Sequence, residues 1–289
     1  MFKKIYYNIL GCFLLASSAA MATEGEQAPA NRPLIVTSIK PLAIIAKSAV
    51  TNAADVQYLL PANQSPHDYT MPVSALKKIA KADLVVWVGE SFETRSAKTM
   101  AKLIEAKRIT AMAIVATESA QQGHSDSHNK NTDPHIWLNP KNGNKIAAEI
   151  QKRLGLPVKQ IISDELIQTL TADMAVAFAG DKSYLSHHDA YGHFVSAFDL
   201  PLGLSLRDTI GGVLGVKSQY QLRKTILNAN ISCVFVEPQY QDKDATNLAA
   251  EFELPLVALD PQGLSQALGD KAYSEFIGGL AEQFKACFQ

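Results

Sequence analysis

The sequence predicts an α/β protein of two lobes, each built on a mainly parallel four-stranded sheet flanked by helices. Two observations carry this prediction. Short, continuously apolar runs alternate with helical patterns, which is typical of parallel sheets covered by helices on both faces. Four such runs fall in each half of the 289-residue chain, which favours two separate sheets over one closed barrel.

The first 22 residues are predicted to be a secretory signal peptide. Lys3 and Lys4 precede a short apolar run, and a small-x-small motif ends at Ala22, where we expect cleavage. The apolar run is too short for a transmembrane helix. A lipoprotein anchored through Cys12 is the alternative. Either reading makes this an exported protein.

The expected strands follow in order after the leader. Those of the N-terminal lobe, residues 33–162, are 34–39, 56–60, 84–89 and 111–116. Those of the C-terminal lobe, residues 181–289, are 184–188, 202–206, 233–237 and 254–260. Each run is short enough for a strand and is followed by polar or turn-forming residues.

Two consecutive helices interrupt the alternation in the middle of the chain. The first is expected over 139–155, because Asn139 is a good N-cap, Pro140 suits the first turn and Gly155 can end the helix. The second is expected within 163–180, with Ser163 as its cap. With no strand between them, the second helix is predicted to be the linker that joins the lobes.

The composition is that of an ordinary globular protein, with 47% hydrophobic and 19% charged residues. The formal net charge is −1, and no basic patch suggests nucleic acid as a partner. Removing the leader with Cys12 leaves Cys233 and Cys287. In an exported protein two cysteines suggest one disulfide, and two buried free thiols are the alternative.

Three of the seven histidines lie within "SHHDAYGHF", residues 186–194. His188 is at the carboxyl end of an expected strand, which is where open α/β sheets bind ligands. Asp189 can cap a helix that begins at Ala190. His193 then lies away from the apolar face of that helix. We therefore expect His188 to be a ligand and His187 and His193 to be structural or exposed.

Other candidate ligands also follow strands or occupy the adjoining loops. They are His67, His135, Glu237 and Asp260. A lone loop histidine is weak evidence, but several of them together with strand-end carboxylates in both lobes favour a metal held in the cleft. Three imidazoles and one carboxylate suit tetrahedral Zn²⁺, and exchanging an imidazole for a carboxylate would favour Mn²⁺. The fourth ligand could be Asp260, Glu237 or water.

The segment 118–133 is polar and loop-like, and it contains His124 and His128. These histidines lack a strand-end anchor. Either the segment is a solvated loop, or these two side chains form a weaker, secondary metal site that collects zinc.

Five motifs together resemble the zinc-binding substrate-binding proteins of ABC transporters, the ZnuA-like members of the cluster A-I solute-binding family. They are "SPHDYTMPVSALKKIAKADLVVWVGESFE", "DPHIWLNP", "HHDAYGHF", "CVFVEPQY" and "LVALDPQG". The resemblance implies two α/β lobes joined by a rigid linker helix, with the metal between them. It implies the ligands His67, His135, His188 and Asp260, and a disulfide between Cys233 and Cys287. The family's histidine-rich loop is here reduced to "GHSDSH", and its usual aspartate in the second motif is Asn139.

The expected function is capture of Zn²⁺ in the periplasm by a monomer and its delivery to a membrane permease powered by a cytoplasmic ATPase. A manganese-binding homologue, a periplasmic zinc buffer and an adhesin are alternatives built on the same site. A zinc hydrolase with Glu237 as general base is a remote alternative, because the sequence has neither an HExxH helix nor a nucleophile elbow. We expect no enzymatic activity.

Overall fold

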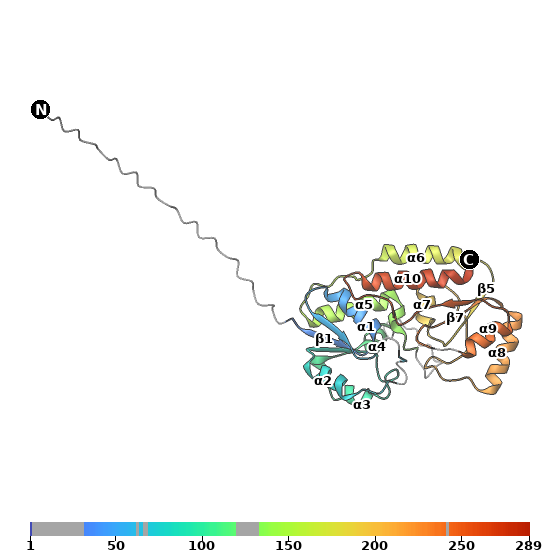
Figure 1. Ribbon diagram of the computed structural model, residues 1–289, viewed down its shortest axis with the longest axis horizontal. Coiled ribbons are helices and arrows are strands. Elements are labelled where there is room, and N and C mark those ends of the chain that lie inside the picture. Colours follow the sequence, from blue (N-terminus) through green and yellow to red (C-terminus); the bar gives the residue numbers. More distant parts are fainter. Residues whose placement is uncertain (2–31, 62–63, 66–68, 120–132, 241–242) are drawn as a thin grey trace. The chain divides into compact units, whose positions relative to one another are not determined.

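The computed structural model describes Met1 and residues 32–61, 64–65, 69–119, 133–240 and 243–289, with the side chains of 117–119 excepted. The predicted signal peptide, its cleavage site and Cys12 therefore lie outside the described residues. Within the described part of the chain, no helix is both long enough and apolar enough to cross a membrane. Two four-stranded sheets organise residues 32–289 (Figure 1).

The first sheet has the strand order β2-β1-β3-β4, and all its pairs are parallel. Its strands are β1 (Leu34–Thr37), β2 (Asp55–Tyr58), β3 (Leu84–Trp87) and β4 (Arg108–Thr110). The connecting helices are α1 (Lys40–Val50), α2 (Val73–Lys81) and the short α3 (Ala97–Met100). A 3₁₀ turn, Glu105–Lys107, leads into β4.

The predicted strand 111–116 is wrong, because this run is the start of helix α4 (Ala111–Ser119). The fourth strand is the more polar segment before it, and Ile109 pairs with Val86 of β3. A continuous apolar run fits a buried helix as well as a strand, and alanine and methionine favour the helix.

The second sheet has the strand order β6-β5-β7-β8, again with parallel pairs. Its strands are β5 (Lys182–Ser186), β6 (Leu204–Ser205), β7 (Asn230–Val236) and β8 (Leu256–Ala258). Its helices are α7 (Gly192–Ala197), α8 (Val216–Asn228), α9 (Lys243–Glu251) and α10 (Ala272–Lys285), and a 3₁₀ turn, Ala286–Phe288, follows α10. All four predicted strands of this half are present.

The two central helices are α5 (Pro140–Arg153) and α6 (Asp164–Ala177), and both predicted caps are confirmed. The Asn139 side chain accepts from the amides of Lys141 and Asn142, and the Ser163 hydroxyl accepts from Leu166 N at 3.3 Å. Gly155 follows the end of α5 with φ +66°, a conformation that favours glycine. Helix α6 runs beside α10 along one edge of the molecule (Figure 1).

One apolar core extends through both halves, and α10 links them. It includes Ile35 of the first sheet and Phe235 of the second. At the start of α10 the hydroxyl of Tyr273 donates to Trp137 O at 2.8 Å. At its end Cys287 is bonded to Cys233 of β7, with the Cα atoms 5.4 Å apart, which confirms the predicted disulfide. The last helix thus fixes the two sheets to each other.

Candidate metal centre

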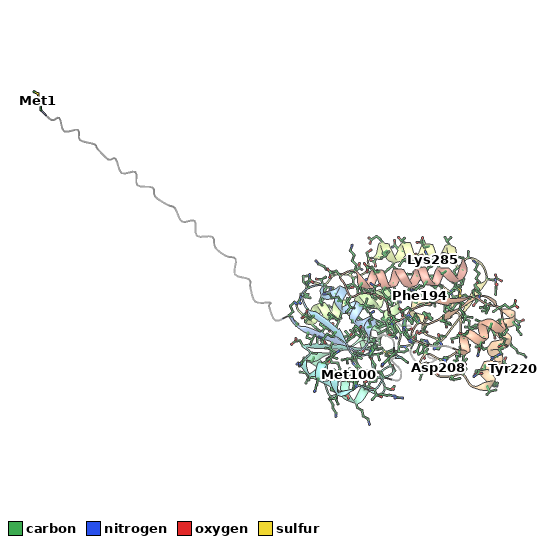
Figure 2. All side chains as sticks on the ribbon, in the orientation of Figure 1. Met1, Met100, Phe194, Asp208, Tyr220 and Lys285 are labelled. Carbon is green, nitrogen blue, oxygen red and sulfur yellow. A yellow bond between two sulfur atoms is a disulfide. The ribbon has the colours of Figure 1, made fainter. Side chains whose placement is uncertain are left out.

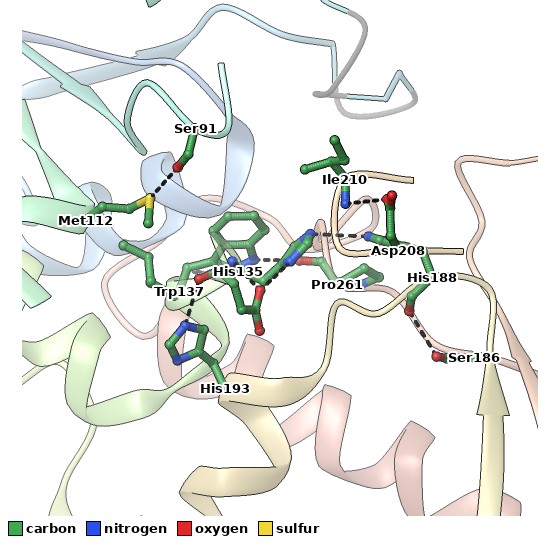
Figure 3. A network of polar contacts seen from close by, with 12 residues as sticks. Ser91, Met112, His135, Trp137, Ser186, His188, His193, Asp208, Ile210 and Pro261 are labelled. Carbon is green, nitrogen blue, oxygen red and sulfur yellow. Dashed lines mark hydrogen bonds and ion pairs between the residues drawn. The ribbon is translucent and has the colours of Figure 1, made fainter. Parts of the chain in front are cut away.

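His135 and His188 come together in the interior of the protein, between the two sheets (Figure 3). His135 precedes a 3₁₀ turn, Ile136–Leu138, and His188 follows β5 by two residues. Both are almost fully buried, with 1% and 3% of their surface exposed. Their Nε2 atoms are 3.2 Å apart.

A carboxylate lies against the other nitrogen of each ring. Oδ1 of Asp133 is 2.8 Å from Nδ1 of His135, and Oε1 of Glu237 is 2.6 Å from Nδ1 of His188. An ionised carboxylate only accepts, so each Nδ1 carries the hydrogen and donates it. This directs the lone pair of each neutral ring, at Nε2, toward the opposite ring. Such carboxylate–histidine pairs orient imidazoles that bind metals.

The two imidazoles differ in their affinity for a proton. Burial alone would lower the pKa of His188, but the carboxylate of Glu237 outweighs it and raises that pKa. Burial lowers the pKa of His135, and the opposing effect of Asp133 does not restore it. Without a metal, a protonated His188 can therefore donate from Nε2 to Nε2 of His135.

The spacing of the two Nε2 atoms also suits a shared metal ion. Two nitrogen ligands at about 2.0–2.1 Å from a tetrahedral zinc ion lie about 3.3–3.4 Å from each other. The observed 3.2 Å is close to that separation. No group of three or more potential metal ligands is found among the residues that the structure describes. The pair can supply two ligand positions.

The other predicted ligands either lie outside the described residues or are engaged in hydrogen bonds of their own. His67, His124 and His128 lie outside the described residues. Asp260 is buried, with 7% of its surface exposed, and its carboxylate accepts from the side chain of Gln239 and from the amides of Gln262 and Leu264. Burial raises its pKa despite these bonds. A carboxylate has about four lone-pair positions, so three bonds leave about one for a metal.

The two other described histidines, His187 and His193, pack against neighbouring residues. The ring of His187 is buried and stacks on Tyr240, with centroids 4.5 Å apart. Nε2 of His193 lies 3.0 Å from the carbonyl oxygen of Asp133, the residue that also holds His135. This contact ties α7 to the segment that carries Asp133 and His135.

The predicted helix start at Ala190 is wrong, because α7 begins at Gly192 with Tyr191 at its N-cap. The amide of Asp189 donates to Arg207 O, and the amide of Ala190 donates to His188 O. These bonds hold residues 188–190 in a turn beside the neighbouring loop, so Asp189 caps no helix.

Comparison with known proteins gives the family. The model of the family described as "Zinc-uptake complex component A periplasmic" matches residues 35–156. The "High-affinity zinc uptake system protein ZnuA" of Haemophilus ducreyi is 30% identical, and the alignment covers 88% of this chain and 92% of that protein. This chain belongs to the ZnuA family.

Two further comparisons agree with this membership. The ZnuA protein of Yersinia pestis is 29% identical over 96% of each chain. The solved structure of the periplasmic zinc-binding protein TroA from Treponema pallidum matches with a TM-score of 0.71 at 16% identity, covering 89% of this chain and 99% of TroA. The structural match to TroA confirms the predicted two-lobe fold. The ZnuA family consists of transport components rather than enzymes.

Sequence reasoning missed Asp133, whose carboxylate lies against Nδ1 of His135. The motif "DPHIWLNP" is singled out for its histidine, although an aspartate two residues before a histidine is itself a detectable signal. Glu237 was considered only as a fourth ligand or a general base, yet its carboxylate lies behind the ring of His188. Phe92 and Trp137 add apolar contacts, with ring centroids 5.8 and 5.2 Å from that of His135.

Proposed function

We propose that this chain captures Zn²⁺ in the periplasm and delivers it to a membrane permease driven by a cytoplasmic ATPase. The observation that supports this most directly is the pair of buried imidazoles with Nε2 atoms 3.2 Å apart, each held from behind by a carboxylate. Membership of the ZnuA family supports the same function.

The proposed ligand set is His135 and His188 together with His67 and Asp260. His135 and His188 bind through Nε2, and zinc competes with the protonation of His188. Asp260 has about one lone pair left for the metal, and Glu237 lies at Nδ1 of His188, on the side of the ring away from Nε2, so Asp260 is the better fourth ligand. A set rich in imidazole favours zinc over manganese.

Several finer features belong to this proposal. The chain is exported by the signal peptide at 1–22 and acts as a monomer. The lobes are 33–162 and 181–289, and the segment 163–180, which contains α6, is the linker. His124 and His128 in the segment 118–133 contribute at most a secondary site of lower affinity.

Metal content and delivery test the two halves of the proposal separately. The mature chain, purified without added metal, should contain about one zinc and little manganese by mass spectrometry of both elements. Zinc-loaded chain should also stimulate the ATPase of the permease complex in lipid nanodiscs, and metal-free chain should not. A manganese-rich preparation would contradict the zinc assignment. Zinc binding without ATPase stimulation would instead favour a periplasmic zinc buffer.

A further inference from the structure

Gly192, the first residue of α7, lies against the carboxylate that holds His135. A Cβ built on Gly192 would be 2.9 Å from Oδ2 of Asp133 and 3.9 Å from its Cγ. Carbon and oxygen atoms in contact settle at about 3.3–3.6 Å from each other. Beyond its own helix and chain neighbours, that Cβ would meet no other described residue within 4 Å. A side chain at position 192 would therefore press on Asp133.

The other side of α7 is packed in the core, which holds the helix in place. Phe194 is fully buried, and its ring centre lies 5.5 Å from that of Phe284 in α10. Figure 2 shows Phe194 inside the outline of the folded part of the chain. Nε2 of His193 adds a polar contact with the carbonyl oxygen of Asp133. If a methyl group is added at Gly192, the side chain of Asp133 therefore has to give way rather than the helix.

The carboxylate of Asp133 cannot give way without disturbing His135. Its Oδ1 accepts from the backbone amide of His135 at 2.9 Å and from Nδ1 of the ring at 2.8 Å. The two oxygens are joined rigidly through Cγ, so a push on Oδ2 also moves Oδ1. Restoring an ordinary contact at Oδ2 takes a shift of about 0.4 Å, which lengthens or bends both bonds to His135.

The backbone at position 192 does not itself require glycine. The described glycines with positive φ lie elsewhere, at Gly89, Gly155, Gly180, Gly211 and Gly263. Alanine also favours helical structure more than glycine does, so alanine would suit the first turn of α7 better. The close approach of Asp133 is what demands a residue without a Cβ at this position.

We propose that Gly192 is a positioning residue of the zinc centre, because it leaves the Asp133 carboxylate the room that it needs to orient His135. An outer partner of a metal-binding imidazole fixes the orientation of the ring and raises its basicity. Gly192 acts on the zinc ligand only through that partner. The proposal rests on the proposed function, in which Nε2 of His135 binds Zn²⁺.

The first test is the zinc affinity of Gly192→Ala, measured by competition against a chelator of known affinity. We expect a loss of about tenfold, at the lower end of the range for losing an outer partner, because the bonds to His135 are distorted rather than removed. Gly278→Ala in α10 is the matched control, because a Cβ there would meet no atom within 4 Å. Its zinc affinity should stay within about twofold of the wild type.

A double-mutant cycle shows whether the effect passes through Asp133. Asp133→Ala removes both atoms that a Cβ at position 192 would meet. In that background, Gly192→Ala should change zinc affinity by less than about twofold. If Gly192→Ala costs the same factor with and without the carboxylate, it does not act through Asp133, and the proposal is wrong.

Proton NMR of the metal-free protein supplies a readout that a purely structural role would not change. The Nδ1 proton of His135 should shift in Gly192→Ala, because its bond to Asp133 is distorted. The Nδ1 proton of His188, which faces Glu237, should move much less. The melting temperature should stay that of the wild type, because only the end of one side chain is displaced.

Two outcomes would overturn the role of Gly192 and leave the proposed function intact. One is a Gly192→Ala chain that binds zinc as tightly as a zinc-binding wild type. The other is a lower melting temperature without a selective shift of the His135 proton, which would make Gly192 a packing residue only. A wild-type chain that binds no zinc would instead contradict the proposed function itself.

Discussion

Glu237 Oε1 lies 2.6 Å from Nδ1 of His188, on the side of the ring opposite His135. The imidazole is therefore held between a carboxylate and a second imidazole, with both partners buried. This arrangement fixes which nitrogen can reach a metal before any metal arrives. Asp133 does the same for His135. The consequences can be measured one residue at a time.

The carboxylates should matter for affinity although they do not touch the metal. We expect Glu237→Gln and Asp133→Asn each to weaken zinc binding by about 10–100-fold, because each ring loses the charge that raises its basicity. Competition against a chelator of known affinity measures this. Asp173→Asn, on the exposed face of α6, is the control. Nitrogen NMR of the imidazoles should show a changed tautomer balance, and wild-type affinity in both variants would contradict the assigned roles.

The two imidazoles themselves should be indispensable. His135→Ala and His188→Ala should lower zinc affinity by roughly 100-fold or more, because each removes a direct ligand. The sequence predicts the same for His67→Ala. Calorimetric titration of each variant is the measurement. His193→Gln can keep a hydrogen bond to Asp133 O and should stay close to the wild type. A His188→Ala protein that still binds zinc tightly would rule out this centre.

Zinc affinity should fall as the solution is acidified, starting above pH 6.5. His188 has a pKa above its ordinary 6.5, so its proton competes with zinc already near neutral pH. The pKa of His135 is lowered, so its competition begins at lower pH. Near neutral pH, zinc binding should release a proton. Calorimetry in buffers of different ionisation enthalpy detects that release, and a heat independent of the buffer would contradict it.

Protein stability should decline as the pH rises toward neutrality because of Glu93. Burial raises the pKa of this carboxyl from 4.5 to about 7, although the amides of Gly89 and Val88 donate to it. The folded state therefore holds a proton that the unfolded state loses above about 4.5. The stabilising contribution is complete below that pH and is lost as the pH passes about 7. It amounts to about 3 kcal/mol at most.

Denaturant unfolding of metal-free protein between pH 5 and pH 8 tests the effect of Glu93. The wild type should lose stability across this range, and Glu93→Gln should show a smaller slope because it cannot ionise. If the two proteins have the same slope, another group is responsible for the pH dependence.

A glycine pair should separate close packing from helix propensity. A Cβ at Gly143 of α5 would come within 2.2 Å of the Tyr273 ring, so Gly143→Ala must displace that buried ring from its place on α10. We expect it to lower the free energy of unfolding by about 1–3 kcal/mol. Gly279 of α10 has open space around it, and Gly279→Ala should raise stability by about 0.5–1 kcal/mol. Thermal melts distinguish the two, and a neutral Gly143→Ala would mean that the helices do not pack this closely.

The sequence predicts a helix or strand correctly where the apolar pattern agrees with the capping or turn-forming residues at its ends. The strands at 84–87 and 230–236 are continuous apolar runs with polar residues beyond them, and the caps of α5 and α6 are local hydrogen bonds. The run at 111–116 fails because apolar content alone does not distinguish a buried helix from a strand. Both the correct and the wrong predictions use only patterns among residues that are close in sequence.

The site could be predicted only in part, for the same reason. His188 follows a strand, so the strand-end rule places it. His135 follows no strand among the described residues, and its contact with His188 joins residues 53 positions apart. The bond from Tyr273 to Trp137 O spans 136 positions. Nothing in the local pattern around residue 273 signals that α10 supports the segment that carries His135.

The position of α10 as the last described helix has a consequence for the order in which the chain can fold. Tyr273 packs against α5, and Cys287 is bonded to the second sheet, so neither half can complete its interior without residues 272–288. A chain that emerges N-terminus first would leave the apolar faces of both sheets uncovered until its final segment is free. On the proposed route of export, the native packing can therefore be completed only after residues 272–288 have crossed the membrane. Until then the segment that carries His135 lacks the support of Tyr273.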